Sequence, residues 1–475
     1  MARSAAGPAK LPSRLYNEGT RHGAFLQTLI QMAILSKDEA QTILKKVLSF
    51  STADECDATL SGNIGGNVRS ARNSISTAGA SENVSLAVES RFGKRAGTAT
   101  CNEFDEATLR RCVQRAEEIA RLAPESPEYM PLLGPQQYLD GSRAFVPATA
   151  GITPDYRAAQ IGASMALCDQ RKLSSAAFLD DSHGFVAKRN SKGLEAYQQV
   201  SNITFSVTVR TPDGTGSGYA SGDYVDAAKM DAARFTKVAA DKAASSMKAR
   251  AIEPGKYTVI LEPNALLSNV DTSLIGALMQ SLDARNADEG RSFLSKKGGG
   301  NRKGEKLFDE RVTIYSDPLN PEISDLTFSG DGRAQQRTTW IEKGVVKNLY
   351  TSRFWAQKTG IPDLPRPNGW IMEGGTQSTA DLIKGTAKGI LVTRLWYIRP
   401  VDPQTLLFTG LTRDGTFYIE NGQIKFPVKN FRFNESPVIM LNNLEAIGKP
   451  VRLNGNLVPP LKIRDFTFTS LSDAV

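Results

Sequence analysis

The spacing of hydrophobic residues along the chain first has a helical period and later an alternating one. From Ser36 onward apolar residues recur every three or four positions, which predicts an amphipathic helix. Ser36 and Glu39 have the spacing of a capping box, in which each side chain satisfies a backbone N–H at the helix start. A second helical stripe runs over 105–122, with acidic residues in its first turn.

Alternating segments follow these helices. The stretches 67–73 and 83–92, separated by the small-residue run 76–81, predict antiparallel strands. A proline-bearing linker is expected over 124–147 and a helix from Thr153-Pro154. Three strands at 176–180, 185–189 and 202–210 and an alanine-rich helix at 226–247 complete this half. The glycine-rich stretch 213–223 is expected to be a solvated hairpin turn.

Strand signals dominate after residue 254. Asn421-Gly422 separates two of these strands and predicts a type I′ hairpin, because both central positions of that turn need positive φ. A strand at 257–262 is followed by an expected helix at 264–281, whose leucines should pack against the sheet. The other strands are expected at 312–315, 338–342, 345–350, 390–398, 406–411, 416–420, 425–433 and 461–468.

These elements predict an α+β fold. An N-terminal α/β region of antiparallel sheets flanked by helices should precede a β-rich C-terminal domain. We expect an extension over 1–36, an N-terminal α/β domain over 37–135, a central α/β domain over 150–250 and the β-rich domain over 251–475. No run of about 18 apolar residues exists, so no membrane span is expected. Polar residues interrupt the apolar stretch near the N-terminus, which favours a cytoplasmic protein over a degenerate export signal.

Charge adds one candidate surface. The net charge of +8 permits an acidic partner without requiring one. The most basic segment, 290–308, is expected to be a solvated loop, with phosphate contact as the alternative. Aromatic residues are sparse within it, which disfavours nucleic acid as a partner. Its candidate contact residues are Arg291, Lys296, Lys297, Arg302 and Lys303.

The residues that usually carry chemistry are scarce. The chain has only two histidines, His22 and His183, and its four cysteines are far apart with no CxxC pair. Zinc sites usually need several histidine or cysteine ligands, so no metal site is expected. His183 should lie in a turn between two strands, and the cysteines should be buried as small apolar residues. There is no phosphate-binding GxxxxGK[ST] and no GxSxG.

Several longer segments resemble one known family in their order along the chain. They are "FDEATLRRCVQRAEEIARLAPESP", "AKRNSKGLEAYQQVSNITFSVTVR", "GRSFLSKK" with "GEKLFDERVTIYSDP", "RTTWIEKGVVKNLYTSRFWAQKTG" and "GILVTRLWYIRPVDPQTLLFTGLTRDGTFYIENGQIKFPVKNFRF". Together they are similar to the TldD/PmbA (TldE) family, over most of residues 37–470.

The resemblance implies a site without its metal ligands. In the catalytic TldD branch, the helix after the "YTVxL" strand carries HExxxH, whose histidines hold zinc and whose glutamate is the general base. This chain has Ser268, Asn269 and Ser273 at those positions, and it lacks the cysteine ligand near the C-terminus. Neutral serine and asparagine side chains do not replace these groups. The resemblance is therefore to the PmbA/TldE branch, with zinc expected only in a catalytic partner.

The same resemblance implies a function. It suggests a non-catalytic subunit of a TldD/TldE-type metallopeptidase complex, acting on unfolded or small peptides. The chain would help to form the substrate cavity and bind peptide by strand addition. Its partner would be a TldD-like HExxxH subunit or a second copy. The alternatives are a self-associating peptide-binding or scaffold protein, and a nucleic-acid-linked factor of the kind suggested by the old family name, modulator of DNA gyrase.

Overall fold

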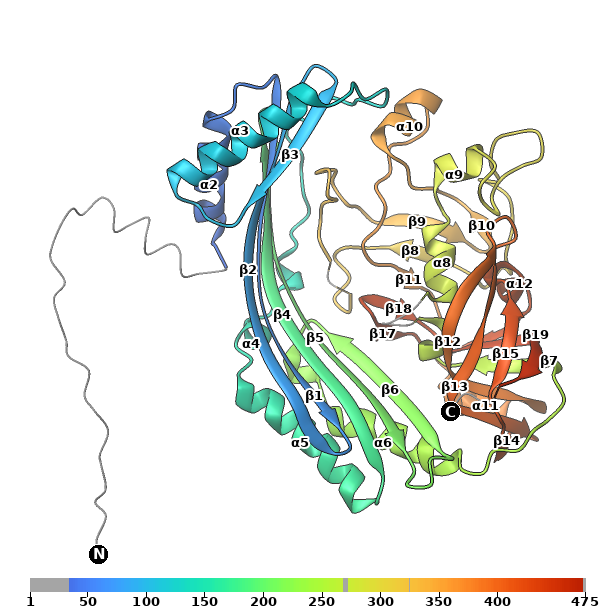
Figure 1. Ribbon diagram of the computed structural model, residues 1–475. Coiled ribbons are helices and arrows are strands. Elements are labelled where there is room, and N and C mark those ends of the chain that lie inside the picture. The colour runs from blue at the N-terminus through green and yellow to red at the C-terminus, as the bar shows by residue number, and fades with distance from the viewer. Residues whose placement is uncertain (1–33, 268–271, 324, 473–475) are drawn as a thin grey trace, which may run out of the picture.

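The protein consists of a long curved sheet and a β-rich C-terminal lobe that faces the inside of the curve (Figure 1). The computed structural model describes residues 34–267, 272–323 and 325–472. Ser268 and Asn269 therefore lie outside the described residues. Within the described ranges, no helix has both the length and the apolar character that a membrane crossing requires.

The curved sheet has six strands in the order β3-β2-β1-β4-β5-β6, and every neighbouring pair is antiparallel. It is shared by the regions that the sequence assigns to the N-terminal and central domains. The strands are β1 (Glu55–Ala71), β2 (Ser74–Phe92), β3 (Arg95–Cys101), β4 (Ser174–Asn190), β5 (Glu195–Arg210) and β6 (Ser217–Tyr224).

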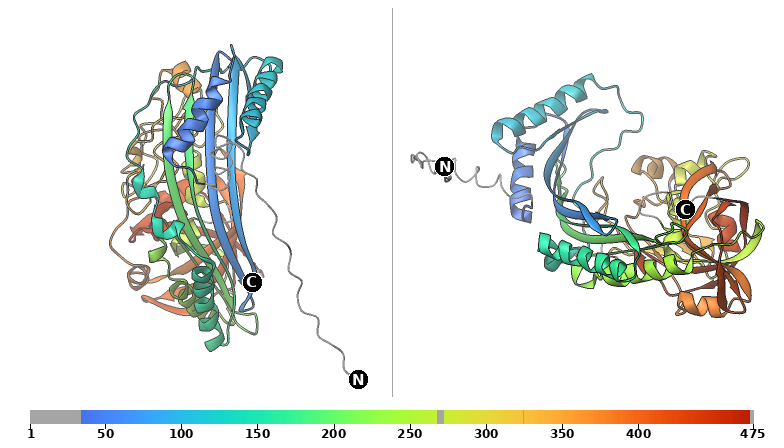
Figure 2. Two further views of the ribbon diagram at one scale, coloured as in Figure 1. Left: turned by 90° about the vertical axis from the view of Figure 1, so that its left-hand side faces the viewer. Right: turned by 60° about the horizontal axis from the view of Figure 1, so that its bottom comes forward.

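Helices cover the outer, convex face of this sheet (Figures 1 and 2). Two hydrophobic cores lie beneath them, one under α2 and α3 and one under α5 and α6. The capping box predicted at Ser36 and Glu39 is confirmed, and Asp105 caps α3 by accepting from the Thr108 N–H at 3.0 Å. The helices are α2 (Lys37–Ser49), α3 (Glu106–Leu122), α4 (Pro147–Ala150), α5 (Pro154–Gln170) and α6 (Ala232–Ser245), with short 3₁₀ turns η2 (Ser142–Ala144) and η3 (Ala227–Lys229).

Two breaks predicted between strands in this half are wrong: the separation at 76–81 and the turn at His183. The run 76–81 lies inside β2, and the chain reverses instead at Arg72 and Asn73, which have φ of 51° and 55°. His183 lies in the middle of β4, paired with Ile64, because 176–180 and 185–189 form one strand. Gly184 is not a turn residue there. A Cβ on it would lie 2.4 Å from the Gly62 carbonyl oxygen, so glycine is needed for close packing of strands.

The glycine-rich stretch 213–223 is also only partly a turn. Its second half is β6, which is buried along almost its whole length. The glycines let helix α6 lie close to this strand. A Cβ on Gly218 would lie 2.0 Å from the Ala239 carbonyl oxygen, and one on Gly222 would lie 2.2 Å from the Phe235 ring. Glycine in this strand therefore marks a close approach of chain segments.

The C-terminal lobe contains a closed ring of strands, β12-β7-β19-β15-β13, because β13 pairs back with β12. The predicted hairpin at Asn421-Gly422 is confirmed, with φ of 50° and 72°. These strands are β7 (Gly255–Leu261), β12 (Lys388–Asp402), β13 (Leu407–Glu420), β15 (Phe431–Glu435) and β19 (Leu461–Leu471), with β14 (Gln423–Pro427) beside β13 and β16 (Leu444–Ile447) beside β19.

A second sheet of the lobe lies beside the ring, toward the inside of the curve (Figure 1), while the ring itself also contacts β6 of the curved sheet. Its strand order is β10-β9-β8-β11-β18-β17. Its strands are β8 (Ile314–Ser316), β9 (Thr338–Glu342), β10 (Val345–Val346), β11 (Ile371–Met372), β17 (Val451–Leu453) and β18 (Asn456–Val458). The remaining helices of the lobe are α9 (Ala284–Asp288), α10 (Arg353–Thr359), α11 (Thr379–Lys384) and α12 (Pro437–Asn442).

The continuous helix predicted over 264–281 is wrong. The structure has two short helices, α7 (Pro263–Leu266) and α8 (Leu274–Gln280), and both Leu267 and Ser273 have extended backbone. Thr272 and Ser273, immediately before α8, have side chains of the kind that competes with helical hydrogen bonding. The predicted apolar stripe is fully buried at its described positions Leu266, Leu274, Ile275, Leu278 and Leu282, whereas Val270 lies outside the described residues.

Candidate functional site

Ser273 is the one described residue of the three positions that match HExxxH. It precedes the first turn of α8 and is 9% exposed, at the edge of the lobe's hydrophobic core. Its side chain forms no capping hydrogen bond with α8. The Ser273 hydroxyl instead fills space beside Gly276, where an added Cβ would lie 2.4 Å from the hydroxyl oxygen.

The donor groups around this position do not fit zinc. No group of three or more histidine, cysteine, aspartate or glutamate side chains that could hold a metal ion occurs in the described part of the chain. His183 lies on the curved sheet, in a different lobe from α8. The neutral hydroxyl of Ser273 lacks the basicity of the imidazole and thiolate groups that bind zinc. We therefore derive no metal-assisted step from this chain's own residues.

A cavity of about 410 Å³ lies where α7 meets the curved sheet. Lys242 of α6 and Glu262, which precedes α7, form an ion pair in its wall, with 15% and 14% of their side chains exposed. Ser221 of β6 donates a hydrogen bond to Asn264 Oδ1 at 2.7 Å. Most of the remaining wall is apolar, with contributions from Tyr219, Phe235, Val238, Pro263, Val451, Leu453 and Pro460. A mostly apolar cavity with a few convergent polar groups is typical of a ligand site.

The inner face of the curved sheet carries both uncharged and charged hydrogen-bonding side chains. Thr204 and Ser206 of β5 are half-buried on this face, and Asn202 lies there beside the C-terminal lobe. The cross-strand register places their neighbours on the same face, because directly opposite residues point the same way. Thr204 lies opposite Asp180 and Asp223, and Ser206 lies opposite Phe178 and Ser221. The same face also carries Ser182 of β4 and Asn63, Asn67 and Arg69 of β1. The face could therefore form hydrogen bonds with a polar chain such as a peptide backbone, with Asp180 and Arg69 as charged neighbours.

A buried ion pair joins the curved sheet to the C-terminal lobe. Arg452 of β17 donates to Asp223 of β6 at 2.9 Å, and the side chains are 7% and 2% exposed. Asp223 also accepts from the backbone N–H groups of Asn454 at 2.7 Å and Gly455 at 3.0 Å. One carboxylate thus binds both the side chain and the turn of the β17–β18 hairpin. This contact, which we call the Asp223 clamp, fixes the inner face against the lobe.

Asp325 lies near the clamp and should make stability depend on pH. Burial raises its pKa to about 6, from an ordinary value of 3.8, although the Leu326 N–H donates to it at 2.7 Å. The folded protein therefore holds a proton that the unfolded chain releases between about pH 4 and pH 6. The stabilising contribution is complete below about pH 4 and is lost as the pH rises to about 6.

This effect can be measured by urea unfolding at pH 4.5 and pH 6.5. We expect Asp325→Asn to remove a stability difference of about 2 kcal/mol between these pH values, at about 1.4 kcal/mol per pKa unit. The same difference in parent and variant would assign the pH dependence to other groups.

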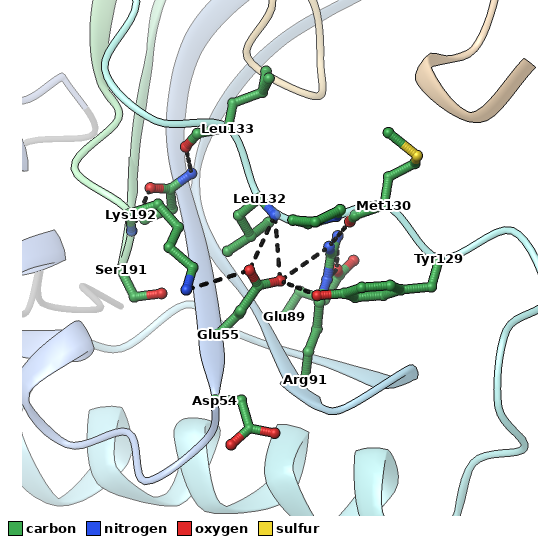
Figure 3. A network of polar contacts seen from close by, with 12 residues as sticks. Asp54, Glu55, Glu89, Arg91, Tyr129, Met130, Leu132, Leu133, Ser191 and Lys192 are labelled. Carbon is green, nitrogen blue, oxygen red and sulfur yellow. Dashed lines mark hydrogen bonds and ion pairs between the residues drawn. The ribbon is translucent and has the colours of Figure 1, made fainter. Parts of the chain in front are cut away.

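A second polar network fixes the linker beside the curved sheet (Figure 3). Glu55 of β1 is 4% exposed and accepts from the Tyr129 hydroxyl at 3.1 Å and from the Leu132 N–H at 3.2 Å. Arg91 and Lys192 lie 3.7 and 3.5 Å from the same carboxylate. Further along this linker, Tyr138 donates to the Gly332 carbonyl oxygen at 2.7 Å. The linker is therefore an ordered bridge from the sheet to the lobe.

The basic segment 290–308 is partly neutralised by acidic side chains. Lys296 and Arg302 pair with Glu305 at 3.0 and 2.9 Å, and Arg291 pairs with Glu289. Lys297 and Lys303 are exposed. These pairs lower the local positive charge on which phosphate binding depends.

The sequence did not identify Glu55, Asp223 or Arg452. Residues 223 and 452 come together only through the tertiary fold, and nothing in their local sequence marks them. The sequence does contain a pattern that belongs to the inner face, because "NITFSVTVR" alternates apolar and polar residues. That pattern predicts a half-buried strand but does not say what its polar side faces.

Comparison with known proteins identifies the family. Three family models match in order along the chain: the PmbA/TldA metallopeptidase domain 1 over residues 56–120, the central domain over 149–247 and the C-terminal domain over 254–470. The chain therefore belongs to the PmbA/TldD metallopeptidase family. The match confirms the resemblance seen in the sequence.

Individual relatives agree with this assignment. The chain is 23% identical over 466 residues to the metalloprotease PmbA of Escherichia coli O157:H7, covering 91% of this chain and 99% of that protein. The fold is similar to TldE from Thermococcus kodakarensis, with a TM-score of 0.80 and 17% identity over 90% of this chain and 99% of that one. The fold is also similar to a Thermotoga maritima protein described as a candidate modulator of a DNA gyrase. The TM-score is 0.81 and the sequence identity is 15%, over 90% of this chain and 100% of that chain.

Proposed function

We propose that this chain is the non-catalytic, TldE/PmbA-like subunit of a cytoplasmic TldD/TldE-type metallopeptidase complex. The observation that carries the proposal is the donor set of the C-terminal lobe. No histidine follows His183 and no cysteine follows Cys168, so the whole lobe lacks both zinc-binding residue types. Ser273, the described residue in the HExxxH alignment, is a neutral side chain at the edge of the core.

The proposed role of the chain is to form part of the substrate cavity. The polar inner face of the curved sheet and the 410 Å³ cavity beside α7 lie at the junction of the two lobes. Serine, threonine and asparagine side chains can hydrogen-bond a peptide backbone without selecting its sequence. Such binding suits a complex that acts on unfolded or small peptides.

The test is co-expression with an HExxxH-bearing relative from the same genome. We expect the isolated chain to bind no stoichiometric zinc and to leave an unfolded peptide intact. The co-purified complex should cleave the peptide in a chelator-sensitive manner, with zinc carried by the relative. Chelator-sensitive cleavage by the isolated chain, unchanged when the relative is added, would contradict the proposal.

A variant of the inner face separates substrate binding from assembly. Thr204→Lys with Ser206→Lys places two charges on the polar face, and we expect KM to rise at least about tenfold with assembly unchanged. The matched control is Ala107→Lys with Gln114→Lys, on exposed positions of the outer helix α3, which should leave KM unchanged.

A further inference from the structure

Helix α3 packs on β3 (Figure 1), and this packing places two of the four cysteines against each other. Cys101 is the last residue of β3, and Cys112 lies in the second turn of α3. The Cys101 thiol donates a hydrogen bond to the Cys112 sulfur. Both side chains belong to the core beneath α2 and α3, where Cys112 is 5% exposed and Cys101 is half-buried. The two thiols are therefore already in contact in the folded protein.

The close approach of α3 to β3 explains why the two cysteines meet. An added Cβ on Gly97 would lie 2.2 Å from the Ala120 nitrogen and 2.4 Å from the Ala116 carbonyl oxygen, so the helix backbone rests on the strand. From Gly97 to Cys101 the strand advances about 14 Å. From Ala120 back to Cys112 the helix covers about 12 Å. Because side chains alternate along a strand, Cys101 points to the same face as Gly97 and meets α3 near Cys112.

The other two cysteines are out of reach of this pair. Cys56 lies opposite Ser90, and Ser90 lies opposite Gly97, so Cys56 is two strands away and level with a residue about 14 Å from Cys101. Cys168 belongs to the separate core beneath α5 and α6. A disulfide requires Cα atoms no more than about 7 Å apart. Burial also raises the pKa of Cys168 and raises that of Cys56 to about 11, which keeps both thiols protonated at neutral pH.

We propose that Cys101 and Cys112 form a site of reversible oxidation, at which a small peroxide converts the two thiols to an intrachain disulfide. Thiols in hydrogen-bond contact need only side-chain rotation to reach the S–S bonding distance of about 2 Å. The disulfide tethers α3 to β3. In a reducing compartment such a bond is transient and responds to oxidants, in contrast to the permanent disulfides of secreted proteins. This inference does not depend on the proposed peptidase role.

The reaction is a two-electron oxidation of sulfur, in which the peroxide oxygens are reduced. The hydrogen bond from Cys101 lowers the pKa of Cys112, so Cys112 loses its proton to solvent and its thiolate attacks one peroxide oxygen. The O–O bond breaks, Cys112 becomes a sulfenic acid, and the departing hydroxide takes the Cys101 proton to form water. The Cys101 thiolate then attacks the Cys112 sulfur. The S–S bond forms, the S–O bond breaks, and the second hydroxide takes up the proton that Cys112 released, so two thiols and hydrogen peroxide give one disulfide and two waters.

The experiment treats the purified full-length chain with hydrogen peroxide and then alkylates the remaining thiols in denaturant. Peptide mapping should show a disulfide between Cys101 and Cys112 in most chains, while Cys56 and Cys168 are alkylated as in the untreated protein. Dithiothreitol should restore alkylation at all four cysteines. Amide hydrogen exchange in α3 should slow at least about tenfold in the oxidised protein, because the tethered helix opens less often.

Serine variants separate the roles of the two thiols. Cys101→Ser should leave a sulfenic acid on Cys112, which a cyclic dione reagent traps, because the second thiol is missing. The matched control, Cys168→Ser, should form the disulfide as the parent does, and both variants should keep the circular dichroism of the parent.

Three results with the parent protein would each overturn the proposal. They are full alkylation of Cys101 and Cys112 after peroxide treatment, a disulfide that involves Cys56, Cys168 or a second chain, and a disulfide that forms only after unfolding in urea. A Cys101→Ser protein that yields no trapped sulfenic acid on Cys112 would overturn the assigned order of attack.

Discussion

Substituting aspartate for Leu274 should unfold the C-terminal lobe. Leu274 is fully buried at the start of α8, within the core that includes Leu278 and Leu282. The substitution removes the leucine's apolar contacts, worth about 2–5 kcal/mol, and buries a carboxylate without a partner at a cost of several kcal/mol more. Together these losses approach the whole stability of an ordinary domain, about 5–15 kcal/mol.

The measurement is urea unfolding followed by tryptophan fluorescence. All four tryptophans lie between residues 340 and 396, so the signal reports on the C-terminal lobe. The matched control is Ile439→Asp on α12, a helix that packs near α8, because Ile439 is 52% exposed. The control should change stability by no more than about 0.5 kcal/mol. A Leu274→Asp protein that unfolds within about 1 kcal/mol of the parent would show that α8 does not pack in the core.

Replacing Asp223 by alanine should cost about 3–5 kcal/mol and loosen the two lobes, because removing one partner of a buried ion pair leaves the other uncompensated. Arg452 would keep its contacts with the Glu322 carbonyl and with Asn202, but it would lose its only anionic partner in the clamp. The backbone N–H groups of Asn454 and Gly455 would also lose their acceptor.

An exposed ion pair between the same lobes provides the control for the Asp223 clamp. Lys229 lies 3.7 Å from Glu322, and their side chains are 49% and 52% exposed. Lys229→Ala should therefore cost less than about 1 kcal/mol. We expect small-angle scattering to show a larger radius of gyration for Asp223→Ala than for Lys229→Ala. Equal stability and equal radius in the two variants would mean that the clamp does not hold the lobes together.

Local chemistry explains which elements could be predicted from the sequence. Ser36 and Glu39 define a helix start within four residues, and Asn421-Gly422 defines a hairpin because few residues accept positive φ. The family resemblance likewise located the α7–α8 segment. These signals depend on neighbouring residues or on the order of motifs, both of which the sequence displays.

The errors have a common physical cause. The small residues at 76–81, His183 with Gly184, and the glycines of β6 were interpreted as turns, but all lie in strands. In each case small residues either let chain segments that are distant in the sequence pack closely together, or they lie along an exposed strand edge. Glycine has the same conformational freedom in a turn and in a tightly packed strand, so composition alone does not distinguish them. The Asp223 clamp was missed because its partners meet only in the folded protein.

The closed ring of the C-terminal lobe has a consequence for how the chain folds. Its first strand, β7, and its last, β19, are direct neighbours, with Val259 opposite Ile463 and Leu261 opposite Leu461. The ring therefore cannot close during synthesis until nearly the whole chain has been made. Contacts between such distant residues are slow to form because a long loop must close first. Until then the edges of β7 and β15 that face β19 remain unpaired in the nascent chain, so the ring of this lobe is completed only after translation is almost finished.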